Sequence, residues 1–150
     1  MILLVCGPPG AGKTTVAGEA RERLRTAGYG FRLLHSDDFS RNTYEKLYER
    51  VSADPDADWI LDGTFYRREY QERFRGLPDA HLISVVASLE LCLKRNRERE
   101  DSIDRRGVHA MHADFEPPEN PDLTLDTEVA SVEEAADALG RYVIQWYDNG

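Results

Sequence analysis

Residues 7–14 read Gly7-Pro8-Pro9-Gly10-Ala11-Gly12-Lys13-Thr14 and match every fixed position of the pattern G-x-x-x-x-G-K-[ST]. In such a loop, glycines let backbone N–H groups turn inward around an anion, and the helix that follows directs its positive end at the same point. Lys13 is expected to reach the β- and γ-phosphates of a nucleotide, and the Thr14 hydroxyl is expected to hold Mg²⁺. This stretch, called the phosphate loop below, therefore predicts a site for ATP or GTP.

The segments on either side of the phosphate loop support this prediction. Ile2-Leu3-Leu4-Val5-Cys6 is a continuous apolar run, which is typical of a strand buried on both faces. Over residues 13–26, Val16, Ala20 and Leu24 recur at helical spacing. The alternative is a glycine–proline turn that binds nothing. We assign phosphate binding to the loop and the first helical turn, namely Gly7, Pro9, Gly10, Ala11, Gly12, Lys13, Thr14 and Thr15.

The length of 150 residues corresponds to one domain, spanning 1–150. The longest apolar stretches are too short to span a bilayer, and Met1 leads directly into the first expected strand, with no signal peptide. We therefore expect a cytosolic protein with no membrane partner. Cys6 and Cys92 belong to no C-x-x-C or Cys/His cluster, so we expect two small buried hydrophobic residues and no zinc site.

The chain is strongly acidic, with a net charge of −9, and only Lys13, Lys46 and Lys94 of its 19 basic residues are lysines. Such a surface repels phosphates, so generic nucleic-acid binding is not expected unless a local arginine patch dominates. The halophilic composition would suit a salt-rich cytoplasm, where screening reduces self-repulsion. The sequence leaves open the choice between ATP and GTP, and between a monomer and a homodimer.

Beyond the first helix, strand patterns alternate with helix patterns. Ser40, Ser88 and Ser131 stand where helix N-caps are expected, and Glu134 completes a capping box with Ser131. We expect strands over 31–35, 59–61, 81–87 and 122–126, and helices over 40–51, 66–75, 89–100 and 132–147. The polar stretch 101–121 predicts a long loop with at most a short helix, and we expect a lid over about 100–121.

This alternation favours parallel strands joined by right-handed crossovers, with helices covering both faces of one sheet. Ligands of such sheets bind beyond the carboxyl ends of the strands. The phosphate loop follows the first strand, Asp37 and Asp38 follow the second, and Asp62 ends the third. We therefore expect one cleft to contain the phosphate loop and three carboxylates.

These carboxylates are candidates for phosphoryl transfer, which needs a group to orient or deprotonate the attacking hydroxyl. We assign that role to Asp37, with Asp38 as the alternative, because neighbouring residues at a strand end point in different directions. Either residue could instead cap the next helix. Asp62 is expected to hold a metal-bound water, and the alternative is a turn formed by Asp62-Gly63.

Arginines supply the positive charge that phosphoryl transfer requires. Arg95 and Arg99 lie four residues apart on one expected helix face and could meet phosphates together as catalytic residues, or they could pair with nearby glutamates in solvent. Arg67 and Arg68 could hold an anionic acceptor or form ordinary surface, and we add Asp38 and Arg41 to the expected acceptor-binding set. His109 and His112 have no third ligand nearby and do not indicate a metal site.

Several segments resemble known families. Residues 7–17, together with Leu33-Leu34 before Asp37, resemble the amino-terminal half of adenylylsulfate kinases, and FEPP (115–118), PDLTLDT (121–127) and SVEEA (131–135) resemble that family's carboxyl-terminal stretch. The middle of the chain is similar to seryl-tRNA(Sec) kinases and elongator-associated P-loop proteins, in the segments LDGTFYRR (61–68) and CLKRNRER (92–99).

The resemblance implies an α/β, three-layer P-loop NTPase fold of the nucleotide-kinase type, with a five-stranded parallel sheet, helices on both faces and an arginine-bearing lid. It also implies ATP with Mg²⁺, Asp37 as the base for the acceptor hydroxyl, and Arg95 and Arg99 as lid arginines. The chain departs from adenylylsulfate kinases at His35-Ser36-Asp37, where they have Asp-Gly-Asp, and at Asp62-Gly63-Thr64, which replaces a Ser-Pro segment.

Together these observations predict a kinase that transfers the γ-phosphoryl group of ATP to a hydroxyl group on a small molecule. One alternative is an ATP-binding switch or assembly factor, in which the order of the lid reports the bound nucleotide to a partner. Another is a kinase acting on tRNA or on the end of a polynucleotide, which would require a basic groove.

Overall fold

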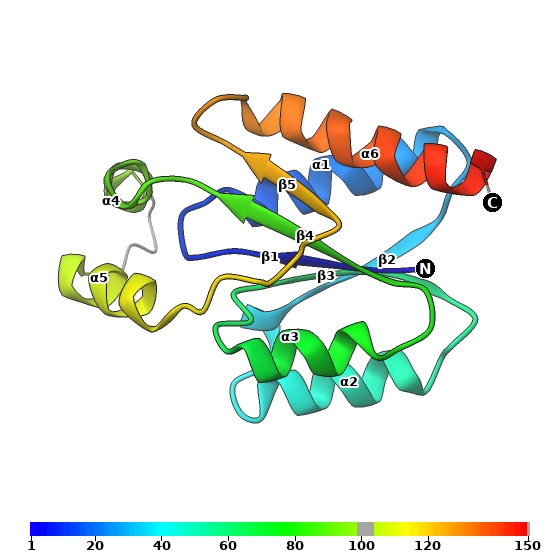
Figure 1. Ribbon diagram of the computed structural model, residues 1–150, viewed down its shortest axis with the longest axis horizontal. Coiled ribbons are helices and arrows are strands. Elements are labelled where there is room, and N and C mark those ends of the chain that lie inside the picture. Colours follow the sequence, from blue (N-terminus) through cyan, green and yellow to red (C-terminus); the bar gives the residue numbers. More distant parts are fainter. Residues whose placement is uncertain (99–103, 150) are drawn as a thin grey trace.

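Five apolar segments pair into one parallel sheet in a computed structural model that describes residues 1–98 and 104–149 (Figure 1). The strand order is β2-β3-β1-β4-β5. The strands are β1 (Ile2–Cys6), β2 (Phe31–His35), β3 (Asp58–Gly63), β4 (Ala80–Val86) and β5 (Leu123–Asp126). The expected five-stranded parallel sheet is therefore confirmed.

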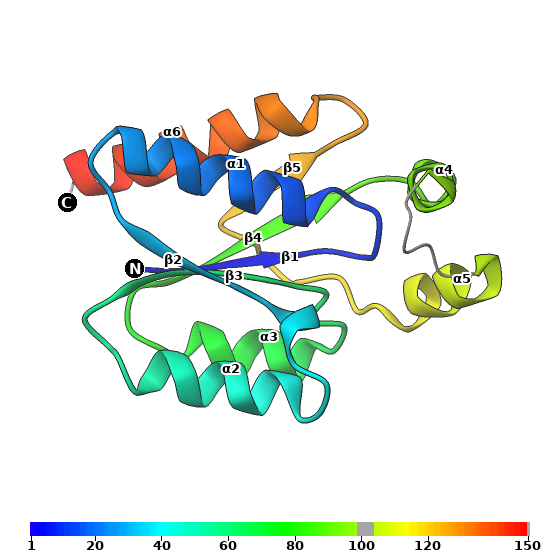
Figure 2. The ribbon, with the colours of Figure 1, turned by 180° about the vertical axis from the view of Figure 1, so that it is seen from behind.

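Helices cover both faces of the sheet, as the alternating pattern predicts. Helices α1 (Lys13–Thr26) and α6 (Val132–Asn149) lie on one face, and α2 (Thr43–Ser52) and α3 (Arg68–Arg75) lie on the other (Figures 1 and 2). The short helix η1 (Ser36–Asp38) follows β2, while α4 (Leu89–Arg97) and α5 (Arg105–Asp114) lie beyond the carboxyl end of β4. No helix in the described ranges combines the length and apolar character needed to cross a membrane.

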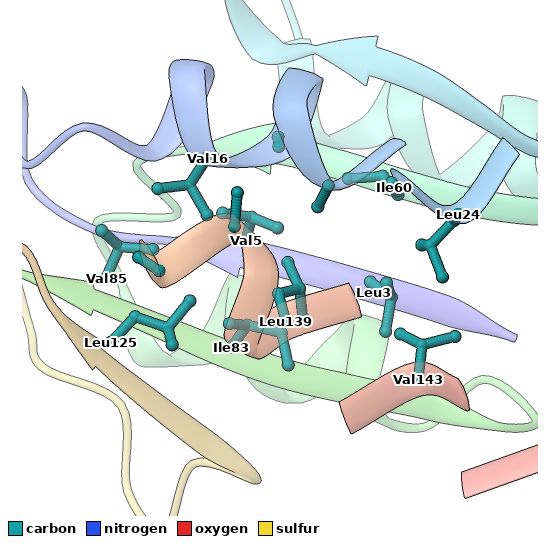
Figure 3. Close-up of a cluster of buried hydrophobic side chains, with 14 of the residues drawn as sticks. Leu3, Val5, Val16, Leu24, Ile60, Ile83, Val85, Leu125, Leu139 and Val143 are labelled. Atoms are coloured by element: carbon teal, nitrogen blue, oxygen red, sulfur yellow. The ribbon is translucent and has the colours of Figure 1, made fainter. Parts of the chain in front are cut away.

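The central strand β1 is buried on both faces because its side chains alternate between two cores. Leu3 and Val5 pack with Leu24, Ile83 and Leu139 between the sheet and helices α1 and α6 (Figure 3). On the opposite face, a second core includes Leu4, Cys6, Leu47, Leu61, Phe65 and Phe74. The two cysteines are free and buried, as expected.

Hydrogen bonds at the helix ends test the expected caps. Ser88 Oγ accepts from Leu91 N at 3.2 Å, and Ser131 and Glu134 form the expected reciprocal capping box. Ser40 does not cap α2: that helix begins at Thr43 after Asn42, which adopts φ 50°. Asparagine tolerates this left-handed conformation better than most residues, so the chain turns sharply there before the helix begins.

Residues 104–121, the described part of the segment 101–121, contain more helix than their composition suggests. Helix α5 runs over Arg105–Asp114, although Gly107 favours a loop. Asp104 offsets this preference because its side chain accepts a hydrogen bond from Gly107 N at 2.9 Å, and Val108 is buried. One ten-residue helix therefore occupies a segment where a long loop with at most a short helix was expected.

Gly7 lies where the phosphate loop leaves β1, and we expect Gly7→Ala to destabilise the protein by about 1–3 kcal/mol. A Cβ atom at Gly7 would lie 2.4 Å from the backbone oxygen of Val85, so the loop or β4 would have to move. Gly18→Ala is the matched control: nothing lies within 4 Å of its Cβ position, and alanine should stabilise α1 by about 0.5–1 kcal/mol. Urea unfolding measures both changes, and equal stability of the two variants would contradict the prediction.

Candidate functional site

The phosphate loop connects β1 to α1 and depends on glycine in two ways. Gly10 and Gly12 adopt φ 85° and 98°, which residues with side chains rarely tolerate. A Cβ atom at Gly10 would also lie 2.9 Å from the backbone oxygen of Cys92, because the loop packs directly against α4. The glycine pattern in the sequence therefore reflects both the curvature of the loop and its close packing.

A cavity of about 470 Å³, called the loop cavity below, opens at the carboxyl end of the sheet. Asp37 and Asp38 reach it from η1 and Arg95 from α4, so the structure brings most of the predicted nucleotide and catalytic residues together. Gly7, Pro9 and Ala11 of the phosphate loop do not line it. The lining residues are Gly10, Gly12, Lys13, Thr14, Thr15, His35, Asp37, Asp38 and Arg95.

A second cavity of about 560 Å³ adjoins the loop cavity, and Asp37 lines both. Its wall combines aromatic and charged side chains. Asp38 lines the loop cavity but not the second one, so the two neighbouring carboxylates differ in what they face. The second cavity is lined by Ser36, Asp37, Phe39, Thr43, Tyr44, Thr64, Tyr66, Arg67, Met111 and Asp114.

A third cavity of about 430 Å³ continues from the second, and the two share Thr43, Tyr44 and Tyr66. Arg41 and Arg73 contribute to its lining. Tyr44 lies between the cavities and accepts a hydrogen bond from Phe65 N at 2.9 Å. Burial raises the pKa of Tyr44 to about 12, so its hydroxyl stays protonated at neutral pH.

Asp62 is almost fully buried, at 3% exposure, and forms a pair with a histidine that the sequence prediction did not include. Its Oδ2 atom lies 2.6 Å from His35 Nδ1, because the register of β2 and β3 places the two residues side by side. His35, rather than Asp62, lines the loop cavity. Asp62 Oδ1 is buried with no hydrogen-bond partner among the described residues.

The predicted arginines occupy different places. Arg95 donates to Gly10 O, Thr127 Oγ1 and Thr127 O at 3.0, 3.0 and 3.1 Å, so it joins α4 to the phosphate loop. Arg67 lines the second cavity with its guanidinium 5.6 Å from the Tyr66 ring centre. Arg68 donates to Pro117 O and lines none of the three cavities. Arg99 lies outside the described residues.

Thr127 is a site residue that the sequence prediction missed. It follows β5, is 4% exposed, and its Oγ1 donates to Ala11 O in the phosphate loop at 2.6 Å. His112 in α5 also reaches the loop, with Nε2 3.2 Å from Pro9 O. In the described part of the chain, no group of three or more His, Cys, Asp or Glu side chains could hold a metal ion.

Cys6, the residue before the phosphate loop, makes the stability of the protein depend on pH. Its thiol donates to Thr64 O at 3.2 Å, and burial raises its pKa from 9.0 to about 12, partly opposed by Lys13. Above about pH 9 the unfolded chain releases this proton while the folded protein keeps it, so the free energy of unfolding falls as pH rises. Between about pH 8 and about pH 10 we expect the wild type to lose about 1.4 kcal/mol more than Cys6→Ala, measured by urea unfolding. Identical pH dependence would contradict this.

Comparisons with known proteins agree with this geometry. A protein-family model described as an AAA domain matches residues 2–118. The adenylyl-sulfate kinase of Vibrio parahaemolyticus is 31% identical over 156 aligned residues, which cover 89% of this chain and 76% of the relative.

Solved structures share the fold. The APS kinase CysC of Mycobacterium tuberculosis, in complex with AMPPNP and APS, superposes with a TM-score of 0.76 at 20% identity, covering 92% of this chain and 94% of that one. Kti12 of Chaetomium thermophilum, in complex with ADP-AlF3, gives a TM-score of 0.74 at 18% identity, covering 93% and 97%. These likenesses show a three-layer P-loop fold of the kinase type.

Proposed function

The chain belongs to the AAA domain family, as a P-loop kinase-like member, and from this we propose that it is an ATP-dependent kinase transferring the γ-phosphoryl group to a hydroxyl group on a small acceptor. One observation carries the proposal: Asp37 lines both the loop cavity and the second cavity. A carboxylate shared by two adjoining cavities can meet a phosphoryl donor on one side and an acceptor hydroxyl on the other.

In this proposal the loop cavity takes the triphosphate of ATP. Amide N–H groups of the phosphate loop bind the phosphates, and Lys13 and Arg95 stabilise the charge on the transferring group. Arg99 is proposed as a further catalytic arginine from its spacing four residues after Arg95 and from the resemblance. We expect the segment 100–121, of which residues 100–103 lie outside the described ranges, to act as a lid, since α5 contributes Met111 and Asp114 to the second cavity.

The second cavity takes the acceptor. Arg67 and Arg41, in the second and third cavities, are proposed to bind acceptor groups, and Asp38 is proposed to contact the acceptor where it enters the loop cavity beside Asp37. Arg68 acts indirectly, by holding Pro117 and Glu119 beside α3. The acceptor oxygen forms a bond to the γ-phosphorus, the bond from that phosphorus to the β–γ bridging oxygen breaks, and the hydroxyl proton passes to Asp37.

The residues present fit a magnesium ion held mainly by nucleotide phosphates and water, which is how proteins usually bind it. Thr14 lines the loop cavity, and Asp62 retains a buried carboxylate oxygen without a partner among the described residues. We propose that Thr14 binds the ion and that Asp62 acts through water. A bound magnesium ion would neutralise charge on the phosphates during transfer.

A transfer screen with labelled ATP tests the proposal. The acceptors are hydroxylated metabolites, nucleosides, adenylylsulfate and total tRNA, each at low and high salt. Label transferred to a small hydroxyl compound is the expected result. Transfer to tRNA alone would favour the polynucleotide alternative, and hydrolysis without transfer to any acceptor would contradict kinase function.

A second candidate function, an ATP-dependent switch or assembly factor, is favoured by the contact between α5 and the phosphate loop. His112 Nε2 lies 3.2 Å from Pro9 O, so the position of α5 can respond to what the loop binds. Slow hydrolysis that no acceptor stimulates, together with co-purification of a partner protein, would support this function over the kinase.

A further inference from the structure

Three backbone carbonyl groups of the phosphate loop accept hydrogen bonds from side chains of other elements. Thr127 Oγ1 lies 2.6 Å from Ala11 O, Arg95 Nη1 lies 3.0 Å from Gly10 O, and His112 Nε2 lies 3.2 Å from Pro9 O. The donors come from the turn after β5, from α4 and from α5, which are separate in the sequence. Three consecutive peptide groups of the loop are therefore held by contacts outside it.

These contacts also set where the loop N–H groups point. No described peptide bond is cis, and in a planar trans peptide the C=O and the following N–H point in opposite directions. Fixing the carbonyls of Pro9, Gly10 and Ala11 therefore turns the N–H groups of the next three residues the other way. The N–H of Ala11 closes a turn onto Pro8 O at 3.2 Å, while Gly10 and Gly12 line the loop cavity.

We propose that Thr127 is a positioning residue for nucleotide binding, which holds the Ala11 carbonyl so that the Gly12 N–H faces the phosphates. Arg95 and His112 hold the carbonyl groups of the two preceding residues, Gly10 and Pro9, and we call the three side chains the carbonyl clamp. The inference rests on the proposed nucleotide site, and it adds residues from outside the phosphate loop that prepare the loop before any phosphate arrives.

Thr127 carries the most weight in the clamp because its contacts are buried and mutually supporting. Its hydroxyl donates to Ala11 O and accepts from Arg95 Nη1 at 3.0 Å, while Arg95 Nη2 fixes the Thr127 carbonyl at 3.1 Å. Ala11 is fully buried, so its carbonyl cannot turn to water if the threonine hydroxyl is lost. The peptide would then rotate toward another donor and take the Gly12 N–H with it.

Thr127→Val keeps the shape of the side chain and removes the hydroxyl, whereas Thr127→Ser keeps the hydroxyl. We expect Thr127→Val to weaken ADP binding about tenfold by calorimetry, and Thr127→Ser to stay within about twofold of wild type. Amide NMR gives a readout that a general loss of stability would not reproduce. The Gly12 signal should shift on addition of ADP in wild type and Thr127→Ser, and should shift less in Thr127→Val.

Each outcome decides between the clamp and the nucleotide site. Equal ADP affinity in wild type and Thr127→Val, or an equal loss in both variants, would overturn the clamp alone. A folded wild type that binds neither ADP nor ATP would overturn the proposed function as well. If Thr127→Val fails to fold, Arg95→Lys provides the test, because lysine keeps the charge but lacks the planar fork through which Arg95 donates to Gly10 O from Nη1 and to Thr127 O from Nη2. Wild-type ADP affinity and an unchanged Gly12 signal in that variant would overturn the clamp.

Discussion

Replacing Lys13 with methionine is expected to lower phosphoryl transfer by about a thousandfold. Lys13 lies at the first position of α1 and lines the cavity beside Gly12 and Thr14. Methionine has a similar length and no charge, so the substitution removes the ammonium group and changes the volume little. We propose that Lys13 is the cation of the phosphate loop that stabilises charge on the transferring group, and methionine cannot replace it in that role.

The matched control is Lys46→Met, because Lys46 is one of only three lysines and lies exposed on α2. It should leave transfer and ADP affinity within about twofold of wild type. Both variants are measured by labelled-ATP transfer and by calorimetry with ADP. Unchanged turnover and unchanged ADP binding in Lys13→Met would remove the phosphate loop from the mechanism.

The parts of the fold that follow from local sequence were predictable. β1 is buried on both faces because its five residues are all apolar. The parallel register of β1, β2 and β3 then brings the carboxyl ends of β2 and β3 to the same edge of the sheet as the phosphate loop. The common location of Lys13, Asp37 and Asp38 around one cavity follows from that topology.

Contacts between distant segments were not predictable from local patterns. The pairing of His35 with Asp62 depends on the register between two strands that lie 27 residues apart in the chain. Thr127 reaches Ala11 across 116 residues, and no local spacing marks a threonine after a strand as a loop contact. Arg95 lines the loop cavity, but its hydrogen bond to the loop backbone was not predicted, because that contact depends on packing between α4 and the loop.

Asp37→Asn is expected to lower the rate of transfer by about a hundredfold to ten-thousandfold, the range for loss of a general base. Asn keeps the size of the side chain and cannot accept the hydroxyl proton. ADP affinity should stay within about twofold or increase slightly, because a negative charge near the phosphates is removed. The rate is measured with the acceptor that the transfer screen identifies, and affinity by calorimetry.

Asp38→Asn separates the two neighbouring carboxylates. Asp38 lines the loop cavity without facing the second cavity, so Asp38→Asn should change the rate of transfer by less than about tenfold, and ADP affinity should stay unchanged or increase slightly because a negative charge near the phosphates is removed. A large loss in Asp38→Asn with little change in Asp37→Asn would move the base to Asp38 and place the acceptor within the loop cavity. A large loss in Asp37→Asn alone would support the second cavity as the acceptor site, because Asp37 is the residue the two cavities share.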